Sequence, residues 1–447
     1  MTTLNRGGTR LAAVLGIALI TGCGLLDTDT PNVIDPNTLN TPEAAEALRL
    51  GALADFAFVK DGDGTQSDDG LILVSGLLSD EFILSTTPPS EQEVDQRTTA
   101  LINPSLSDVY FNLHKARGGM ENAGAALRQF LVEPDSSVEI PEMHSLAGLT
   151  YVYFGEDFCN GVPFSRVSGD SLIFGAAQTN TQMFETALGK FDSALAHPGL
   201  QQDDGTITNL ALVGRARALL DLGRFDEAAA AVADVPTEFQ YVSEHAESPL
   251  SIQNAIWSYT SQGLWSVANQ EGGNGLAYIT AEDPRVPVDS LDDDGDGEPD
   301  TGLDSQTIQY VLLKYGDAGA SVVVADGVEA RLIEAEAQLQ NNDFGGMRTT
   351  LDGLRGTVGL PNLPVVGTRD EAIDVLFAER AFWLYATGHR LGDMRRLIRQ
   401  YQRTADTVFP IGDYHKGGAA YGSDVNLPIP IEEQNNPNGG TCIDRNA

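Results

Sequence analysis

The sequence ERAFWLYATGHRLGDMRRL occupies residues 379–397 and combines arginines with acids at helical spacing. Asp393 lies three residues from both Arg390 and Arg396, so it can pair with either across one helical turn. The planar guanidinium of arginine suits partly buried carboxylates. Because cations are scarce in this acidic chain, we interpret these charges, including Glu379 and Arg380, as structural pairs and not as catalytic groups.

Apolar residues accompany this charged helix. Phe382 and Trp383 lie inside it and are predicted to belong to the core. Farther along, NLPIPIEEQNNPN occupies residues 426–438. Its prolines remove backbone donors and resist helix formation, so we expect residues 427–430 to form an extended strip against the helices.

Most of the preceding chain has a helical pattern. Gly223 separates two short helices within residues 209–235, and residues 341–343 turn a second hairpin within residues 326–355. Both resemble tetratricopeptide units, although the irregular spacing excludes a uniform solenoid. The other expected helices cover residues 42–58, 107–130, 143–153 and 181–196.

Two regions break the helical pattern. Residues 240–320 contain turns, a glycine cluster and an acidic run, and residues 404–447 contain four prolines, at 410, 428, 430 and 437. We expect long structured loops in both regions. Loops of this length often carry function.

The N-terminus predicts export. Arg6 and Arg10 precede an apolar run over residues 11–20, which small residues separate from Cys23. This order is typical of a secretory signal peptide, and the run is too short to span a bilayer. It resembles the bacterial lipobox, in which the cysteine is lipidated after cleavage. The alternative is an ordinary signal peptide with a chance cysteine. Gly24 follows, not an aspartate that would suggest inner-membrane retention, so we expect an outer-membrane anchor.

Composition excludes a nucleic-acid-binding protein. The chain has 447 residues and a net charge of −37, which becomes −39 once Arg6 and Arg10 are removed with the signal peptide. Such a charge repels phosphates and anionic lipids, so membrane attachment has to come from the lipid anchor. Residues 24–41 are rich in Asp, Asn, Pro and Thr and are interpreted as a spacer.

The order of these motifs resembles the SusD/RagB family of surface lipoproteins. That family shows an E-R-x-x-E-L-x-x-E-G-x-R-x-x-D-L-R-R helix followed by L-P-I-P-x-x-E-x-x-x-N-P-x. Here ATG at residues 386–388 replaces Phe-Glu-Gly, and GDM at residues 392–394 replaces Phe-Asp-Leu. Supporting segments are RLIEAEA at 331–337, FG at 154–155, GVPF at 161–164 and DPR at 283–285.

The resemblance implies a mainly α protein with a SusD-like fold, in which four tetratricopeptide-like hairpins support a loop-rich binding region. It divides the chain into a signal peptide (1–22), a spacer (23–41) and one domain (42–447) with loop insertions at about 240–320 and 404–447. It also implies a non-enzymatic function. The lipoprotein would capture a nutrient, most simply a glycan, and deliver it to a TonB-dependent SusC-like channel.

Two other functions remain open. A tetratricopeptide scaffold would bind peptides or envelope proteins through a continuous groove. A surface hydrolase would need a nucleophile or paired carboxylates. No nucleophile elbow, phosphate loop or dinucleotide motif occurs, and the six histidines are scattered, so no organic cofactor or zinc site is expected.

Two cysteines remain if Cys23 is lipidated. An oxidising compartment favours a disulfide between Cys159 and Cys442, which would hold the C-terminal tail against the body. The alternative is two unpaired thiols.

An acidic run suggests calcium. Asp292, Asp294 and Asp296 occupy positions one, three and five of a calcium loop, and Gly297 occupies position six. The backbone of Glu298 and the side chains of Asp300 and Asp304 would complete the set. Leu303 stands where an EF-hand has glutamate, so a solvated acidic loop is the alternative.

Sugar ligands stack on aromatic rings. Within the irregular region the candidates for such a platform are Trp257, Tyr259, Trp265 and Tyr278. The alternative is that these rings form a small core beneath the loops.

Overall fold

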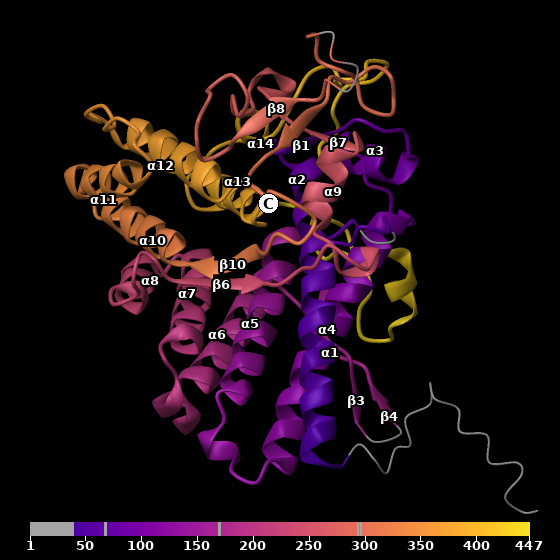
Figure 1. Ribbon diagram of the computed structural model, residues 1–447, viewed down its shortest axis with the longest axis vertical. Coiled ribbons are helices and arrows are strands. Elements are labelled where there is room, and N and C mark those ends of the chain that lie inside the picture. Colours follow the sequence, from indigo (N-terminus) through magenta and orange to yellow (C-terminus); the bar gives the residue numbers. More distant parts are fainter. Residues whose placement is uncertain (1–39, 67–68, 169–170, 293–294, 296) are drawn as a thin grey trace, which may run out of the picture.

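The computed structural model describes residues 40–447, except residues 67–68, 169–170, 293–294 and 296. The described chain is mainly helical and consists of two parts (Figure 1). We call the four helix pairs the helical half. The remaining short helices, strand pairs and connections are the loop-rich half.

The helical half contains four helix pairs, and each pair contacts the next pair along the chain. Its pairs are α1 (Pro42–Asp61) with α4 (Pro104–Phe130), α5 (Glu139–Asp157) with α6 (Asn180–Leu195), α7 (Thr206–Asp221) with α8 (Phe225–Val232), and α10 (Gly327–Gln340) with α11 (Phe344–Thr357). Further contacts of α4 with α5, α6 with α7 and α8 with α10 join the pairs. The predicted helices and the implied four pairs are confirmed. The first two pairs are not direct hairpins, because the short helices Leu71–Leu78 and Pro89–Asp95 lie between α1 and α4, and short strands between residues 162 and 178 separate α5 from α6.

Local signals start and end these helices as the sequence predicts. Thr41 caps α1 by accepting a hydrogen bond from Ala44 N at 3.2 Å, and Pro42 occupies the first turn. The predicted turns also form. Gly223 between α7 and α8 has φ of 72°, and Asn342 between α10 and α11 has φ of 58°, both in the left-handed region that these residues tolerate best.

The loop-rich half is built from short elements. Its helices are α2 (Leu71–Leu78), α3 (Pro89–Asp95), α9 (Ala255–Ser261), α12 (Arg369–Trp383), α13 (Arg390–Arg399) and α14 (Ala405–Val408). Its short 3₁₀ turns cover Leu250–Ile252, Glu271–Gly273 and Ile431–Asn435, whereas the 3₁₀ turns Pro134–Ser136 and Pro198–Gln202 connect helices of the helical half.

All the strand pairs of the described chain are antiparallel and two-stranded. They are β1 (Phe82–Leu84) with β7 (Trp265–Val267), β2 (Val162–Pro163) with β5 (Ala177–Gln178), β3 (Arg166–Ser168) with β4 (Ser171–Ile173), β6 (Gln240–Ser243) with β10 (Val322–Asp326), and β8 (Val288–Ser290) with β9 (Tyr310–Leu312). In the first pair, Phe82 lies opposite Val267. Several of these strands fall within residues 240–320, so that predicted loop region contains short regular elements.

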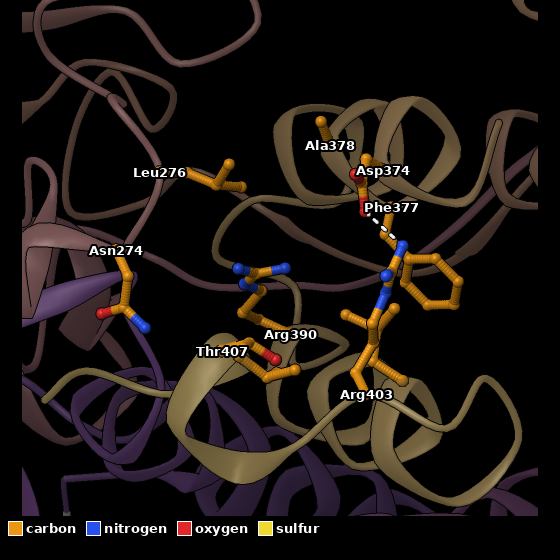
Figure 2. Close-up of a pocket in the computed structure, with 10 residues that line it drawn as sticks. Asn274, Leu276, Asp374, Phe377, Ala378, Arg390, Arg403 and Thr407 are labelled. Atoms are coloured by element: carbon orange, nitrogen blue, oxygen red, sulfur yellow. Dashed lines mark hydrogen bonds and ion pairs between the residues drawn. The ribbon is translucent and has the colours of Figure 1, made fainter. Parts of the chain in front are cut away.

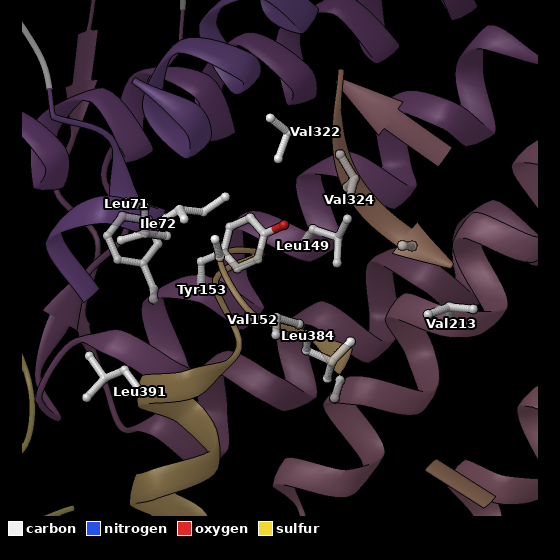
Figure 3. Close-up of a cluster of buried hydrophobic side chains, with 14 of the residues drawn as sticks. Leu71, Ile72, Leu149, Val152, Tyr153, Val213, Val322, Val324, Leu384 and Leu391 are labelled. Carbon is white, nitrogen blue, oxygen red and sulfur yellow. The ribbon is translucent and has the colours of Figure 1, made fainter. Parts of the chain in front are cut away.

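The hydrophobic core joins the two halves. Every residue of α2 is buried, and Figure 3 shows Leu71 and Ile72 of this helix beside Tyr153 of α5. Leu391 of α13 and Val324 of β10 belong to the same cluster. One continuous core therefore fixes the loop-rich half on the helices. Among the described residues, no helix is both long and apolar enough to cross a membrane.

The predicted C-terminal strip is also confirmed. Leu427 N donates to Asp157 O at 2.7 Å, and Cys159 N donates to Leu427 O at 3.0 Å. The side chains of Leu427 and Ile429 are buried. This extended segment therefore lies along the C-terminal end of α5.

Candidate functional site

The turn between α12 and α13 positions the C-terminal arginines. Ala386 has φ of 54°, a conformation that costs a non-glycine residue about 1–2 kcal/mol. Its N–H donates to Glu81 Oε1 at 2.9 Å, and its carbonyl accepts from Tyr315 Oη at 2.8 Å. Both partners are buried and hold the turn in place. Arg390 then begins α13.

Buried ion pairs connect α13 to α12 and α10. Asp393 accepts from Arg380 Nε and from Arg396 Nη2, each at 2.7 Å. Arg396 Nη2 also donates to Glu336 Oε2 of α10 at 3.0 Å. Burial opposes the charge on Asp393, but the two guanidinium groups outweigh it and hold the pKa of this carboxyl below its usual value. The predicted pairing of these charges is therefore present in the structure.

Two more carboxylates, those of Asp80 and Glu379, pair with arginines that lie far from them in the sequence. Arg390 forms a two-pronged pair with Asp80, with Nε to Oδ1 at 2.6 Å and Nη2 to Oδ2 at 2.8 Å. Arg390 therefore pairs outside α13 and not with Asp393. Glu379 accepts from Arg285 Nη1 at 2.6 Å and also pairs with Arg355.

A pocket of about 410 Å³ opens between α12, α13, α14 and the segment that follows β7. Figure 2 shows Arg390 in the middle of the pocket, with Asn274 and Leu276 on one side and Asp374 and Arg403 on the other. The apolar part of the wall comes from Leu276, Phe377, Leu397 and Val408. The pocket therefore combines apolar walls with a few converging polar groups, as ligand sites in proteins commonly do.

The polar groups of the pocket are held in place by neighbouring residues. Arg403 Nη2 donates to Asp374 Oδ1 at 2.8 Å, and Asn274 Nδ2 donates to Phe409 O at 2.8 Å. Arg390 has five N–H donors, of which the pair with Asp80 uses two. Fixed guanidinium, carboxylate and amide groups over an apolar wall suit a ligand that carries many hydroxyl groups.

Three of the four aromatic rings predicted as a sugar platform are core residues. Tyr259, Trp265 and Tyr278 are 3%, 1% and 0% exposed. Tyr259 packs edge-on against Trp265, and Tyr278 packs against Tyr385 at 4.7 Å between ring centres. Since other side chains already cover these rings, this structure presents none of the three to a ligand. Trp257 packs on the same core and stays partly exposed.

The predicted disulfide is confirmed. Cys159 and Cys442 are bonded, with their Cα atoms 5.7 Å apart and 283 positions between them in the sequence. Beside this bond, Ile443 N donates to Asn160 O at 2.7 Å. The tail is therefore held by both a covalent bond and the backbone.

The calcium prediction is only partly covered by the described residues. Asp294 and Asp296 lie outside them, and Asp292 accepts from Gly295 N at 2.9 Å. Asp304 is engaged elsewhere, with Lys416 Nζ 2.8 Å from its carboxylate. No group of three or more acidic, histidine or cysteine side chains in the described part of the chain is placed to hold a metal ion.

Beyond Asp304, backbone bonds close the base of the acidic loop. Asp300 N donates to Leu291 O at 2.7 Å, and Glu298 follows Gly297 in an exposed bend. Calcium binding stays a prediction. Cys23 and the predicted signal peptide and spacer also lie outside the described residues, apart from the last two spacer positions.

Several residues of the pocket were not identified from the sequence. They are Asn274, Leu276, Asp374, Arg403 and Thr407. They come from separate segments, and no spacing within any one segment marks them. Only a general feature of the sequence points to this pocket: a charged helix near the C-terminus is followed by long loops.

Comparison with solved structures identifies the fold. A SusD superfamily protein from Bacteroides thetaiotaomicron superposes with a TM-score of 0.67 at 14% identity, covering 90% of this chain and 100% of that one. A SusD-like carbohydrate-binding protein from Bacteroides fragilis gives 0.64 at 17% identity, covering 89% and 99%. Surface glycan-binding protein A from Bacteroides uniformis gives 0.63 at 14% identity, covering 88% and 97%.

Neither a protein-family model nor a curated protein matches this chain. The structural matches nevertheless cover nearly the whole described chain. The protein therefore has the SusD-like fold, as its C-terminal motifs implied.

Proposed function

We propose that this protein captures a glycan and that the pocket between α12, α13 and α14 holds part of it. The observation that carries the proposal is this pocket, with its fixed polar groups over an apolar wall, in a fold shared with proteins described as carbohydrate-binding. Its hydrogen-bonding groups are of the kind that sugar hydroxyls recognise. A non-enzymatic binding function agrees with the pairing of the buried arginines and acids with one another.

The test is a glycan array, run beside a peptide array, on the purified full-length protein. Arg403→Ala should weaken the preferred glycan by about tenfold or more, because a charge-assisted hydrogen bond contributes roughly 1.5–3 kcal/mol. Arg215→Ala is a matched control in the helical half. The two side chains are 27% and 25% exposed, and each pairs with an exposed aspartate at 2.8 Å.

Two results would contradict the proposal. One is an equal loss of glycan binding in both arginine variants, and the other is binding to the peptide array alone. The second result would favour the tetratricopeptide scaffold. A pocket of about 520 Å³ on α4, next to the exposed Phe111 and Leu172, is where such a scaffold would take a peptide.

We extend the proposal to attachment and delivery. Lipidated Cys23 would anchor the domain to the outer membrane, and residues 24–41 would span several tens of ångströms if extended, at roughly 3.3 Å per residue. Tethering would raise the local concentration of the domain beside a SusC-like channel to about the millimolar range. The channel would then receive the captured glycan.

Fractionation and affinity purification test these two steps separately. Cys23→Ala should move the protein out of the membrane fraction or leave the precursor uncut. Purification from solubilised outer membranes should recover a TonB-dependent channel in near-equal amount. Normal outer-membrane fractionation of the variant would exclude lipid anchoring at Cys23. Recovery of the lipoprotein alone across several detergents would exclude a stable channel complex.

A further inference from the structure

A second, smaller cavity lies at the seam of the two halves and has no part in the glycan site. Its volume is about 200 Å³, the space of roughly six or seven water molecules in the liquid. The residues that line it come from β6, β10, the N-terminal end of α10, the turn between α12 and α13, and the segments that hold Arg285 and Lys314. Charged groups of both signs line this small space.

Two cations line the cavity, Lys314 and Arg285, and Arg285 is already paired with Asp283 and Glu379. Lys314 is different. Its ammonium donates to Tyr385 O at 2.6 Å. Among the described residues, no carboxylate lies within ion-pair distance of it. Burial lowers the pKa of Lys314 to about 8, in spite of the attraction of Asp326 and Glu81. A second negative group in the cavity would stabilise this ammonium.

The anions are Asp326 and Glu329, at the start of α10. Asp326 Oδ1 accepts from Glu329 N at 2.7 Å and caps the helix. No lysine, arginine or histidine of the described chain forms an ion pair with the Asp326 carboxylate. Burial raises the pKa of Asp326 to about 6 and that of Glu329 to about 7. Among the described residues, no lysine or arginine lies within ion-pair distance of either carboxylate. Lys314 attracts Asp326 from farther away, and Arg217 and Arg380 attract Glu329 from farther away as well. A closer positive partner would favour the ionised forms.

His389 does not supply that partner. Its Nε2 atom lies 2.8 Å from Arg217 Nη1 and 3.2 Å from Glu329 Oε1. A guanidinium has only donors, so Nε2 accepts from Arg217 and has no proton to give to Glu329. Burial, together with Arg217, holds the pKa of His389 well below its usual value. The imidazole is therefore neutral, and Glu329 keeps an acceptor available at the cavity.

The rest of the lining offers one more donor and an apolar surface. Trp383 Nε1 is buried, with no hydrogen-bond partner in the described structure. Arg285 lies over the indole ring at 5.2 Å from its centre, which fixes the ring. Val323 and Val328 add the apolar wall. The lining thus combines a cation, two carboxylates, an indole whose N–H has no partner in the described structure, and an apolar wall.

We propose that this cavity binds a small zwitterion, an α-amino acid with a short aliphatic side chain. Its carboxylate would face Lys314 and the Trp383 indole N–H, and its ammonium would face Asp326 and Glu329. A simple anion would leave both carboxylates unpaired, a simple cation would leave Lys314 unpaired, and a neutral sugar would compensate neither. This function goes beyond glycan capture and depends on different residues.

Calorimetric titration of the purified full-length protein tests the proposal. The probe is L-valine, compared with isobutylamine, which lacks the carboxylate, with 3-methylbutanoate, which lacks the ammonium, and with D-glucose. Valine should bind with measurable heat. Each analogue should bind at least about tenfold more weakly, because each loses one charge-assisted contact.

Variants locate the binding. Lys314→Met and Asp326→Asn should each weaken valine binding about tenfold or more. Asparagine keeps the helix cap, so the second variant removes only the charge. Trp383→Phe keeps a smaller aromatic ring but removes the N–H, and it should also weaken valine binding. Lys190→Met is the control, since this lysine is 26% exposed and pairs with Glu121 outside the cavity.

Three outcomes would overturn the proposal. They are no heat with valine from protein that still unfolds cooperatively, binding of either analogue as tightly as valine, and unchanged valine binding in both charge variants. Glycan binding measured on the same samples separates this site from the proposed function. Loss of glycan binding in Arg403→Ala should leave valine binding intact.

Discussion

The helical half and the loop-rich half are held together by different kinds of interaction. In the helical half, most neighbouring helices follow one another in the chain and bury small and apolar residues. Long segments nevertheless separate α1 from α4 and α8 from α10, and a buried pair, Arg217 with Glu156, joins α7 to α5. In the loop-rich half, the pair of Arg390 with Asp80 joins residues 310 positions apart, and the disulfide joins residues 283 positions apart. Long-range contacts thus replace regular packing where the loops need a defined shape. Substitution of a buried charge in the loop-rich half should therefore lower the free energy of unfolding by more than substitution of a helix cap in either half.

The largest effect is expected from Arg396→Met. Arg396 joins α13 to Glu336 of α10, and both partners are buried. Removing one member of such a pair leaves an uncompensated buried charge, which typically costs about 3–5 kcal/mol in the free energy of unfolding. Urea denaturation measures it. Arg403→Met is the control, and its partly exposed pair should contribute no more than about 1 kcal/mol. Similar losses in both variants would remove the distinction between the two classes of charge pair.

The disulfide should rank second. Cys442→Ser releases the C-terminal tail from Cys159, and the chain-entropy argument gives about 2–4 kcal/mol for typical disulfides. Denaturation with and without reductant measures the loss, and limited proteolysis should cut residues near the C-terminus first. Cys159→Ser is the matched change at the other end of the bond. A tail that stays resistant to protease would show that its backbone contacts suffice.

A smaller effect is expected from pH. Burial raises the pKa of Glu81 and Glu271 to about 8 and that of Glu329 to about 7. The folded protein therefore keeps protons that the unfolded chain has lost. Raising the pH from about 6.5 to about 8 should destabilise the fold, by at most about 1.4 kcal/mol per pH unit for each group.

Histidines oppose this slope only at its start. Burial lowers the pKa of His144 to about 4, so its contribution to stability rises with pH and is complete about one pH unit above the unfolded value of 6.5; His114, His197 and His389 behave in the same way. Urea denaturation at several pH values should show the slope, and Glu81→Gln should flatten it. A free energy of unfolding that rises between about pH 6.5 and about pH 8 in the wild type would contradict the raised pKa values of these glutamates.

The smallest difference is expected from helix caps. Thr179 starts α6 and Thr368 starts α12, and each forms a capping box with the residue three positions later. Thr→Ala at either site should cost about 1 kcal/mol by thermal or urea unfolding. Because a cap is local, the two halves should respond alike. A much larger loss at Thr368 would show that local signals also carry more weight in the loop-rich half.

The sequence by itself determined the local features of this protein. Apolar spacing, Thr41, Gly223 and Asn342 specified helices and turns, because the contacts involved lie within a few residues. It also predicted the disulfide that the structure contains, because Cys159 and Cys442 were the two cysteines left to pair once Cys23 was assigned to the lipid. The order of the C-terminal motifs implied the SusD-like fold that the solved structures share.

Only the tertiary structure decided which charges meet and which rings are exposed. Nothing in the sequence around Asp80 or Arg390 predicts that these two residues pair. Trp265 is a residue type that often stacks on sugars, but strand β7 places its ring in the core. The two candidate binding sites likewise combine residues from separate segments. The physical reason is that burial and pairing depend on the distances between distant segments, which chain spacing alone does not fix.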